Sequence, residues 1–246
     1  MTRDIARRWR LVAVGVLGVN LLLVLGCSGS RRSVPATAWD RDTEAGKAAF
    51  AHGHYEEASR RFTAALAKAE SFGAQDARLA TSLNNLAAVD RVQRRYAEAE
   101  ALDRRALTIQ EMALGSMHPF VATTLNGLAD SVRAQGRPAE AEPLAKRVVA
   151  IREQVLGREH PEVAAALNNL GLICAAQGRW AEAEPYYQRA LAIYEQQLGR
   201  SDPAVARVLD NYAALLRRSP RAAEAGALEA RARAIRAAQP AGNLSN

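Results

Sequence analysis

The 246-residue sequence has few cysteines and few aromatic residues, and each shortage excludes a class of protein. Its two cysteines, Cys27 and Cys174, are too few for a disulfide framework or for a zinc site that needs more than two thiolates. Aromatic residues make up 5% of the chain, and Val, Ile and Tyr form no alternating run, which argues against an all-β fold. Alanine and arginine, two strong helix formers, are abundant, so a helical protein is expected.

A dense basic patch is also missing, although the formal net charge is +7. The first 26 residues hold four arginines and one aspartate and contribute +3, which leaves +4 spread over the remainder. A nucleic-acid-binding protein usually shows a more concentrated patch. The sequence therefore predicts no nucleic-acid partner.

The N-terminus has the pattern of a targeting segment, with arginines followed by an apolar run from Leu11 to Gly26. This run has 16 residues, fewer than the roughly 20 that a membrane-spanning helix needs. The tetrapeptide at positions 24–27, Val-Leu-Gly-Cys, resembles the lipobox of bacterial lipoproteins. That resemblance implies cleavage before Cys27, acylation of Cys27, and, because Ser28 follows, sorting to the outer membrane. The alternative is an uncleaved helix that anchors the chain in the inner membrane.

Four segments are predicted along the chain. Residues 1–26 form the lipoprotein signal peptide, and residues 27–39, which contain Gly, Ser and Pro, form a flexible tether. Residues 40–238 form a repeat domain, and residues 239–246 form a disordered tail.

A repeat with a period of 42 residues fills the third segment. The motif Leu-Asn-Asn-Leu-Ala begins at Leu83 and recurs in related form at Leu125, Leu167 and Leu209. A slightly shorter copy precedes it, which makes five units. Each unit contains two predicted helices, because proline stands at the start of the first helix in several units and a glycine column ends the second.

This pattern resembles the tetratricopeptide repeat, and in particular the 42-residue version found in kinesin light chains and many bacterial proteins. The stretch Gly-Arg-Trp-Ala-Glu-Ala-Glu-Pro-Tyr-Tyr, from residue 178, is close to that consensus. The resemblance implies an all-α, right-handed α-solenoid of about five helix pairs. It is specific for the fold and unspecific for the function, since solenoids bind many kinds of partner.

In this family the first helix of each pair lines a concave groove, which implies a set of groove residues in this chain. They are Asn84, Asn85, Arg91, Asn126, Asp130, Arg133, Asn168, Asn169, Asp210, Asn211, Arg217 and Arg218. Their carboxamides could bind the backbone of an extended peptide, and their guanidinium groups could bind carboxylates. Alternatively, the asparagines hold one helix to the next. Gly127 and Asp210 depart from the asparagine pattern and weaken the inference at those positions.

No catalytic residue, cofactor or metal ion is expected. His52 and His54 have a possible metal-binding spacing but no acidic or thiol companion, and Cys174 has the surroundings of a buried apolar residue. The sequence therefore predicts a lipid-anchored adaptor that faces the periplasm and binds a protein or peptide in its groove, such as an assembly factor of an envelope complex. An inner-membrane regulatory subunit with an uncleaved helix and an enzyme are the alternatives.

Overall fold

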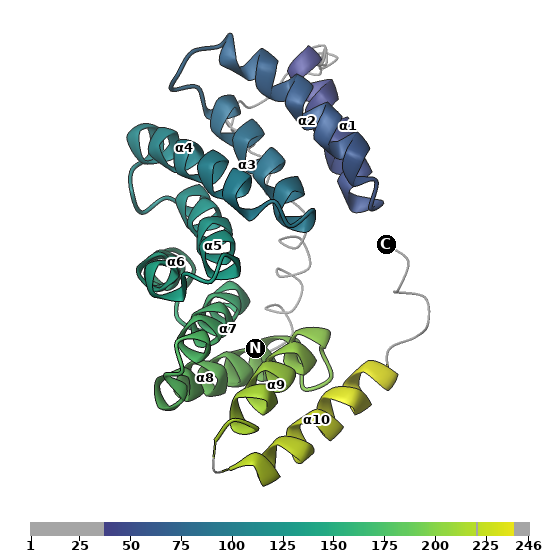
Figure 1. Cartoon of the computed structure of the whole chain (residues 1–246), viewed down its shortest axis with the longest axis vertical. Helices are drawn as coiled ribbons and strands as arrows, with labels where there is room; N and C mark the ends of the chain where they lie inside the picture. Colours follow the sequence, from purple (N-terminus) through teal and green to yellow (C-terminus); the bar gives the residue numbers. More distant parts are fainter. Residues whose placement is uncertain (1–36, 220, 239–246) are drawn as a thin grey trace, which may run out of the picture. The chain divides into compact units, whose positions relative to one another are not determined.

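The computed structural model describes residues 37–219 and 221–238, and this part of the chain is all-α (Figure 1). Its ten helices are α1 (Ala38–Ala51), α2 (Tyr55–Glu70), α3 (Ala77–Val92), α4 (Tyr96–Leu114), α5 (Pro119–Ala134), α6 (Pro138–Leu156), α7 (Pro161–Ala176), α8 (Trp180–Leu198), α9 (Pro203–Leu216) and α10 (Ala222–Ala237). The predicted signal peptide, the predicted acylation site Cys27 and the predicted tail lie outside the described residues.

Each helix packs against the helices next to it in the sequence, so five helix pairs stack in chain order from α1 to α10 (Figure 1). The first helices of neighbouring pairs also approach one another, with Cα atoms within 8 Å between α3 and α5 and between α7 and α9. The second helices of neighbouring described pairs have no such approach. The first helices therefore form the inner side of the stack, and the solenoid predicted from the repeat is confirmed.

The first helices begin at capping residues that the repeat supplies at one position. Asp76 and Asp202 accept a hydrogen bond from a backbone N–H in the first turn, at 2.8 Å in both cases. Histidine is a poorer cap by preference, yet His118 and His160 act in the same way, since each Nδ1 accepts from the N–H two residues on, at 3.2 and 3.1 Å. The second helices α4, α6 and α8 end before glycines with positive φ.

Helix α1 begins at Ala38, two residues before the start expected for the repeat domain. Thr37 caps the helix, because its side chain accepts from the Asp40 backbone N–H while the Asp40 carboxylate accepts from the Thr37 N–H. The Trp39 indole then donates a hydrogen bond of 2.8 Å to the Ser82 hydroxyl on α3. Residues 38 and 39, assigned to the tether by their composition, are thus part of the first helix pair.

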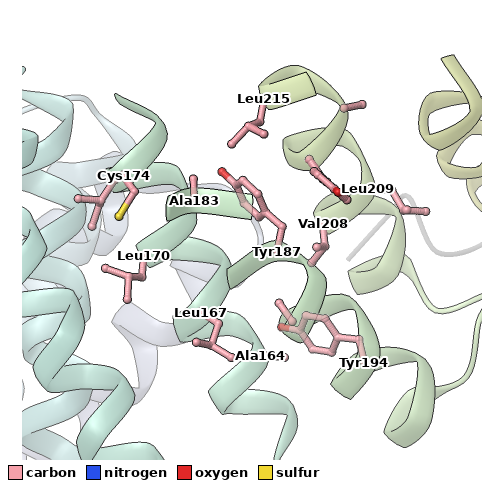
Figure 2. Close-up of a cluster of buried hydrophobic side chains, with 14 of the residues drawn as sticks. Ala164, Leu167, Leu170, Cys174, Ala183, Tyr187, Tyr194, Val208, Leu209 and Leu215 are labelled. Atoms are coloured by element: carbon pink, nitrogen blue, oxygen red, sulfur yellow. The ribbon is translucent and has the colours of Figure 1, made fainter. Parts of the chain in front are cut away.

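The small residues that the sequence places at matched positions on the two helices of a pair are buried. Each of the alanines at these points is nearly or fully buried: Ala87, Ala99, Ala129, Ala141, Ala183, Ala213 and Ala225. In the fourth pair Gly171 stands in this column, and a Cβ atom there would lie 2.8 Å from Cε1 of Tyr187. The ring of Tyr187 occupies that space within the apolar cluster between α7, α8 and α9 (Figure 2).

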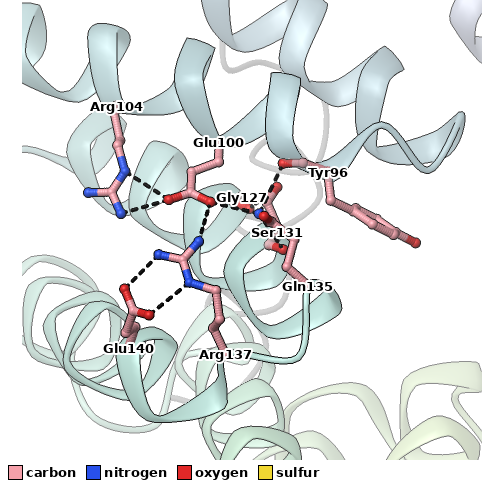
Figure 3. A network of polar contacts seen from close by, with 8 residues as sticks. All are labelled: Tyr96, Glu100, Arg104, Gly127, Ser131, Gln135, Arg137 and Glu140. Atoms are coloured by element: carbon pink, nitrogen blue, oxygen red, sulfur yellow. Dashed lines mark hydrogen bonds and ion pairs between the residues drawn. The ribbon is translucent and has the colours of Figure 1, made fainter.

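Arginine side chains bridge the wider spacing between the second helices. Arg137, just before α6, pairs with Glu100 of α4 at 2.8 Å and with Glu140 of its own helix at 2.6 Å (Figure 3). The same arrangement recurs 42 and 84 residues later, around Arg179 and Arg221. A second row of bridges joins Arg105 to Glu70, Arg147 to Glu111, Arg189 to Glu153, and Arg231 to Glu195. Much of the excess arginine is therefore used between repeats.

Candidate functional site

A pocket of about 410 Å³ opens among the inner helices α3, α5 and α7. Its lining consists of Arg91, Val92, Tyr96, Asp130, Arg133, Ala134, Asn169 and Leu172. Four of these, Arg91, Asp130, Arg133 and Asn169, belong to the groove residues predicted from the sequence. The pocket thus combines two guanidinium groups, a carboxyl group and a carboxamide with apolar side chains.

Arg91 is held from two sides inside the structure. Its Nη1 lies 2.5 Å from Oδ2 of Asp103, a residue of α4 that is 1% exposed. Its guanidinium also lies against Gly127, where a Cβ atom would come within 2.7 Å of Nη1. Gly127, which interrupts the asparagine pattern, therefore leaves space for the side chain of Arg91 from the preceding repeat.

The Asp103 carboxyl group is an unusual partner, because burial raises its pKa to about 7. The charge and hydrogen bond of Arg91 act in the opposite direction, and the nearby Asp130 adds to the rise. Burial likewise raises the pKa of Asp130, and the charges of Arg133 and Arg91 only partly offset this effect. Asp130 in the pocket lining and Asp103 behind Arg91 therefore both hold their protons more tightly than exposed carboxyl groups do.

Arg217 also has an internal partner in the last helix pair. Its Nε and Nη2 donate to the two carboxylate oxygens of Glu229 at 2.6 and 2.7 Å. Asp210, another predicted groove residue, pairs with Arg236 at 2.5 Å. Arg218 is exposed. At this end of the stack the described groove charges are satisfied largely within the chain.

The asparagines connect neighbouring first helices. Asn169 on α7 donates a 3.0 Å hydrogen bond to Oδ1 of Asn126 on α5, and Asn211 on α9 donates one of 2.9 Å to Oδ1 of Asn168. Asn84 on α3 donates to the Thr124 hydroxyl of α5 at 2.7 Å. These contacts support the alternative in which the carboxamides hold one helix to the next.

Asn168 is 3% exposed, so the expectation that its side chain is exposed in the groove is wrong. The neighbouring helix α9 supplies its hydrogen-bond partner and removes it from solvent. Asn85, Asn126, Asn169 and Asn211 remain half-buried, and of these only Asn169 lines the pocket.

Sequence reasoning overlooked Asp103 and Gly127 as determinants of the groove. A signal was present, because Arg91 and Asp103 are twelve residues apart, as are Arg217 and Glu229. Comparison of these two repeat positions along the chain would have indicated which arginines have an acidic partner.

Neither a metal-binding cluster nor a membrane-spanning helix occurs among the described residues. They contain no group of three or more His, Cys, Asp or Glu side chains that could hold a metal ion. No described helix combines the length and apolar character needed to cross a bilayer. Cys174 is 1% exposed, and burial raises the pKa of its thiol.

Comparison with known proteins agrees with this architecture. The tetratricopeptide repeat family matches residues 78–154, 120–196 and 162–238, which together span more than half of the chain. A search of the curated proteins gave no match.

Solved structures with the same fold include two related to kinesin light chains. The crystal structure of a putative kinesin light chain from Podosopora anserina, with nearly identical TPR-like repeats, has 26% sequence identity and a TM-score of 0.68. The match covers 80% of this chain and 94% of that one. BtubC (BKLC) from P. vanneervenii has 25% identity and a TM-score of 0.68, with coverage of 78% and 77%.

A Rap protein complexed with Competence and Sporulation Factor shares the fold at 18% identity and a TM-score of 0.65. That match covers 80% of this chain and 54% of the Rap chain. A tetratricopeptide solenoid is typically a non-enzymatic scaffold for protein–protein interaction, and its extended inner surface is where partners bind. From its 42-residue repeat, its ten described helices and the family match, this chain belongs to the tetratricopeptide repeat family.

Proposed function

We propose that the repeat domain binds an extended segment of a partner protein in the groove formed by α3, α5 and α7. The observation that carries this proposal is the pocket of about 410 Å³, which combines Arg91, Arg133 and Asn169 with apolar side chains. A peptide offers carbonyl groups, carboxylates and apolar side chains, and each of these has a matching group in the pocket.

Binding at this surface needs little rearrangement of the groove. Asn169 is fixed by its hydrogen bond to Asn126, and Arg91 by its contact with Asp103. A ligand that meets positioned side chains loses less free energy in ordering them than one that meets a mobile surface. The carboxamides that join the repeats thus also keep the groove in one shape.

We further propose that acylated Cys27 anchors the domain at the periplasmic face of the outer membrane. The lipobox-like sequence at positions 24–27 and Ser28 support this location. Several acyl chains make an anchor stable, whereas one chain gives marginal binding. In cells fed labelled fatty acid, the wild-type chain should take up label and Cys27→Ser should not. A wild-type chain that stays unlabelled in the inner-membrane fraction would favour an uncleaved anchor.

Site-specific photo-crosslinking tests the groove directly in the full chain. A photo-reactive amino acid at Leu172, which lines the pocket, should give a discrete adduct with a partner protein. The matched control is Met112 on α4, which is 65% exposed and lies outside the pocket lining. The proposal fails if Leu172 gives no adduct, or if both positions give the same one.

A further inference from the structure

The arginine at the end of the first helix has different ion-pair partners in different repeats. Arg91 and Arg217 each pair with an acidic residue twelve positions later, Asp103 and Glu229. Arg133 occupies the same repeat position, but the residue twelve positions after it is Ala145, which is 4% exposed. Its guanidinium therefore lacks the internal carboxylate that the other two possess.

The surroundings of Arg133 do not replace that carboxylate. Arg133 is half-buried, and it forms no ion pair with any residue in the described part of the chain. Asp130, one turn earlier on α5, acts on it through charge, but the two side chains form no ion pair. The neighbouring Arg91 is already paired with Asp103. The pocket thus contains one partly desolvated guanidinium group without an opposite charge in contact.

We propose that a carboxylate of the bound partner pairs with the guanidinium group of Arg133. This inference rests on the proposed function of the groove and specifies the chemistry of its ligand. The carboxylate is that of an aspartate or glutamate side chain or of a chain terminus, since all three present the same two oxygens to an arginine.

The rest of the lining indicates what lies beside this carboxylate. Val92, Ala134 and Leu172 supply apolar surface, and Tyr96 adds an aromatic ring. Asn169 supplies a carboxamide fixed by Asn126. An acidic group next to an apolar residue, in an extended backbone, therefore matches the pocket best.

An array of synthetic peptides of equal length, probed with the detergent-solubilised full chain, tests the inference. One set has amidated ends and internal acidic residues, a second has no acidic residue but a free terminal carboxylate, and a third has neither. We expect binders from the first or second set, and which of the two binds identifies the source of the carboxylate. Fluorescence anisotropy should show affinity falling roughly 10- to 100-fold when the carboxylate becomes an amide.

Three variants assign this preference to Arg133. In Arg133→Gln the difference between the acid and amide peptides should disappear, whereas in Arg217→Gln, whose arginine has an internal partner, it should remain. Ala145→Asp supplies the missing internal acid and should also remove the preference while the arginine is retained. Circular dichroism establishes whether each variant is folded. If Ala145→Asp does not fold, the comparison of the wild type with Arg133→Gln still tests the inference.

The ways in which the inference can fail are distinguishable. In one outcome, binders come equally from all three sets, with equal affinity for the acid and amide forms. This result overturns the carboxylate inference and leaves peptide binding by the groove in place. A carboxylate preference that persists in Arg133→Gln also overturns it. An array without any binder contradicts the proposed function and the inference together.

Discussion

Arg91, Arg133 and Arg217 occupy one position of the repeat, and their neighbours give the three guanidinium groups different surroundings. Arg91 contacts a carboxyl group that is 1% exposed, whereas Arg217 pairs with Glu229 at the surface. A buried ion pair gains more from attraction but loses more hydration than an exposed one. For Asp103 the loss of hydration dominates, and its pKa rises to about 7.

The raised pKa of Asp103 makes stability depend on pH in a defined direction. The folded chain binds this proton more tightly than the unfolded chain, in which the aspartate has its ordinary pKa of 3.8, so stability falls as pH rises from about 4 to 7. Asp103→Asn should remove this dependence, and the free energy of unfolding of the wild type should fall relative to that of the variant by up to roughly 2–3 kcal/mol between pH 5 and 8.

Urea titrations at several pH values measure this difference. Glu229→Gln is the matched control, because the pKa of the Glu229 carboxyl is lowered by Arg217 and its titration lies below this pH range. The control should follow the wild type between pH 5 and 8. Parallel pH profiles for the wild type and Asp103→Asn would show that Asp103 stays ionised in the folded protein.

At the scale of helices, the inner and outer sides of the stack are held by different interactions. The first helices approach closely and exchange short hydrogen bonds, such as that between Asn169 and Asn126. The second helices lie further apart, and long arginine side chains such as Arg137 reach across. The small residues within each pair are buried. Side-chain length thus matches the spacing on each side of the stack.

The packing of α7 against α8 predicts the effect of adding one methyl group. Gly171→Ala should lower the free energy of unfolding by about 1–3 kcal/mol, because the new Cβ atom would lie 2.8 Å from the buried ring of Tyr187. Gly226→Ala in α10 is the matched control, since a Cβ atom there meets nothing within 4 Å. This control should gain roughly 0.5–1 kcal/mol from helix propensity. Equal changes in chemical denaturation would contradict the packing argument.

At the scale of the molecule, the described domain is a linear stack in which each helix pair contacts only the pairs beside it in sequence. Stability in such a stack is approximately the sum of the individual pairs and their interfaces. The first and last pairs have a neighbour on one side within the described residues. The middle pairs have a neighbour on both sides. A continuous apolar cluster extends from α5 to α10, and the pairs before it contribute to smaller, separate clusters.

Hydrogen exchange should therefore depend on position along the stack. We expect backbone amides of α1 and α10 to exchange roughly tenfold or more faster than those of α5 to α8, because the terminal pairs open without disrupting two interfaces. Exchange followed by mass spectrometry on the full chain measures this profile, with the urea-unfolded chain as the reference for intrinsic rates. Uniform protection from α1 to α10 would indicate a single cooperative unit instead.

The sequence by itself determined the helices, their pairing and the repeated stack. Proline and aspartate at helix starts, glycine at helix ends and alanine at the close approaches act on neighbouring residues within one repeat, so their effect can be inferred from local spacing. It also placed Arg91, Asp130, Arg133 and Asn169 on the inner helices, where the structure brings them to one pocket.

Only the tertiary structure decided which of the groove side chains remain available to a partner. Asn168 is covered by the next repeat, Arg91 is held by Asp103 and Gly127, and Arg133 is left without an internal carboxylate. These outcomes depend on side chains that are twelve or about forty residues apart and meet only when the helices stack. The repeat gives such residues equivalent backbone positions, but the identity of each neighbour across the interface sets its burial and charge.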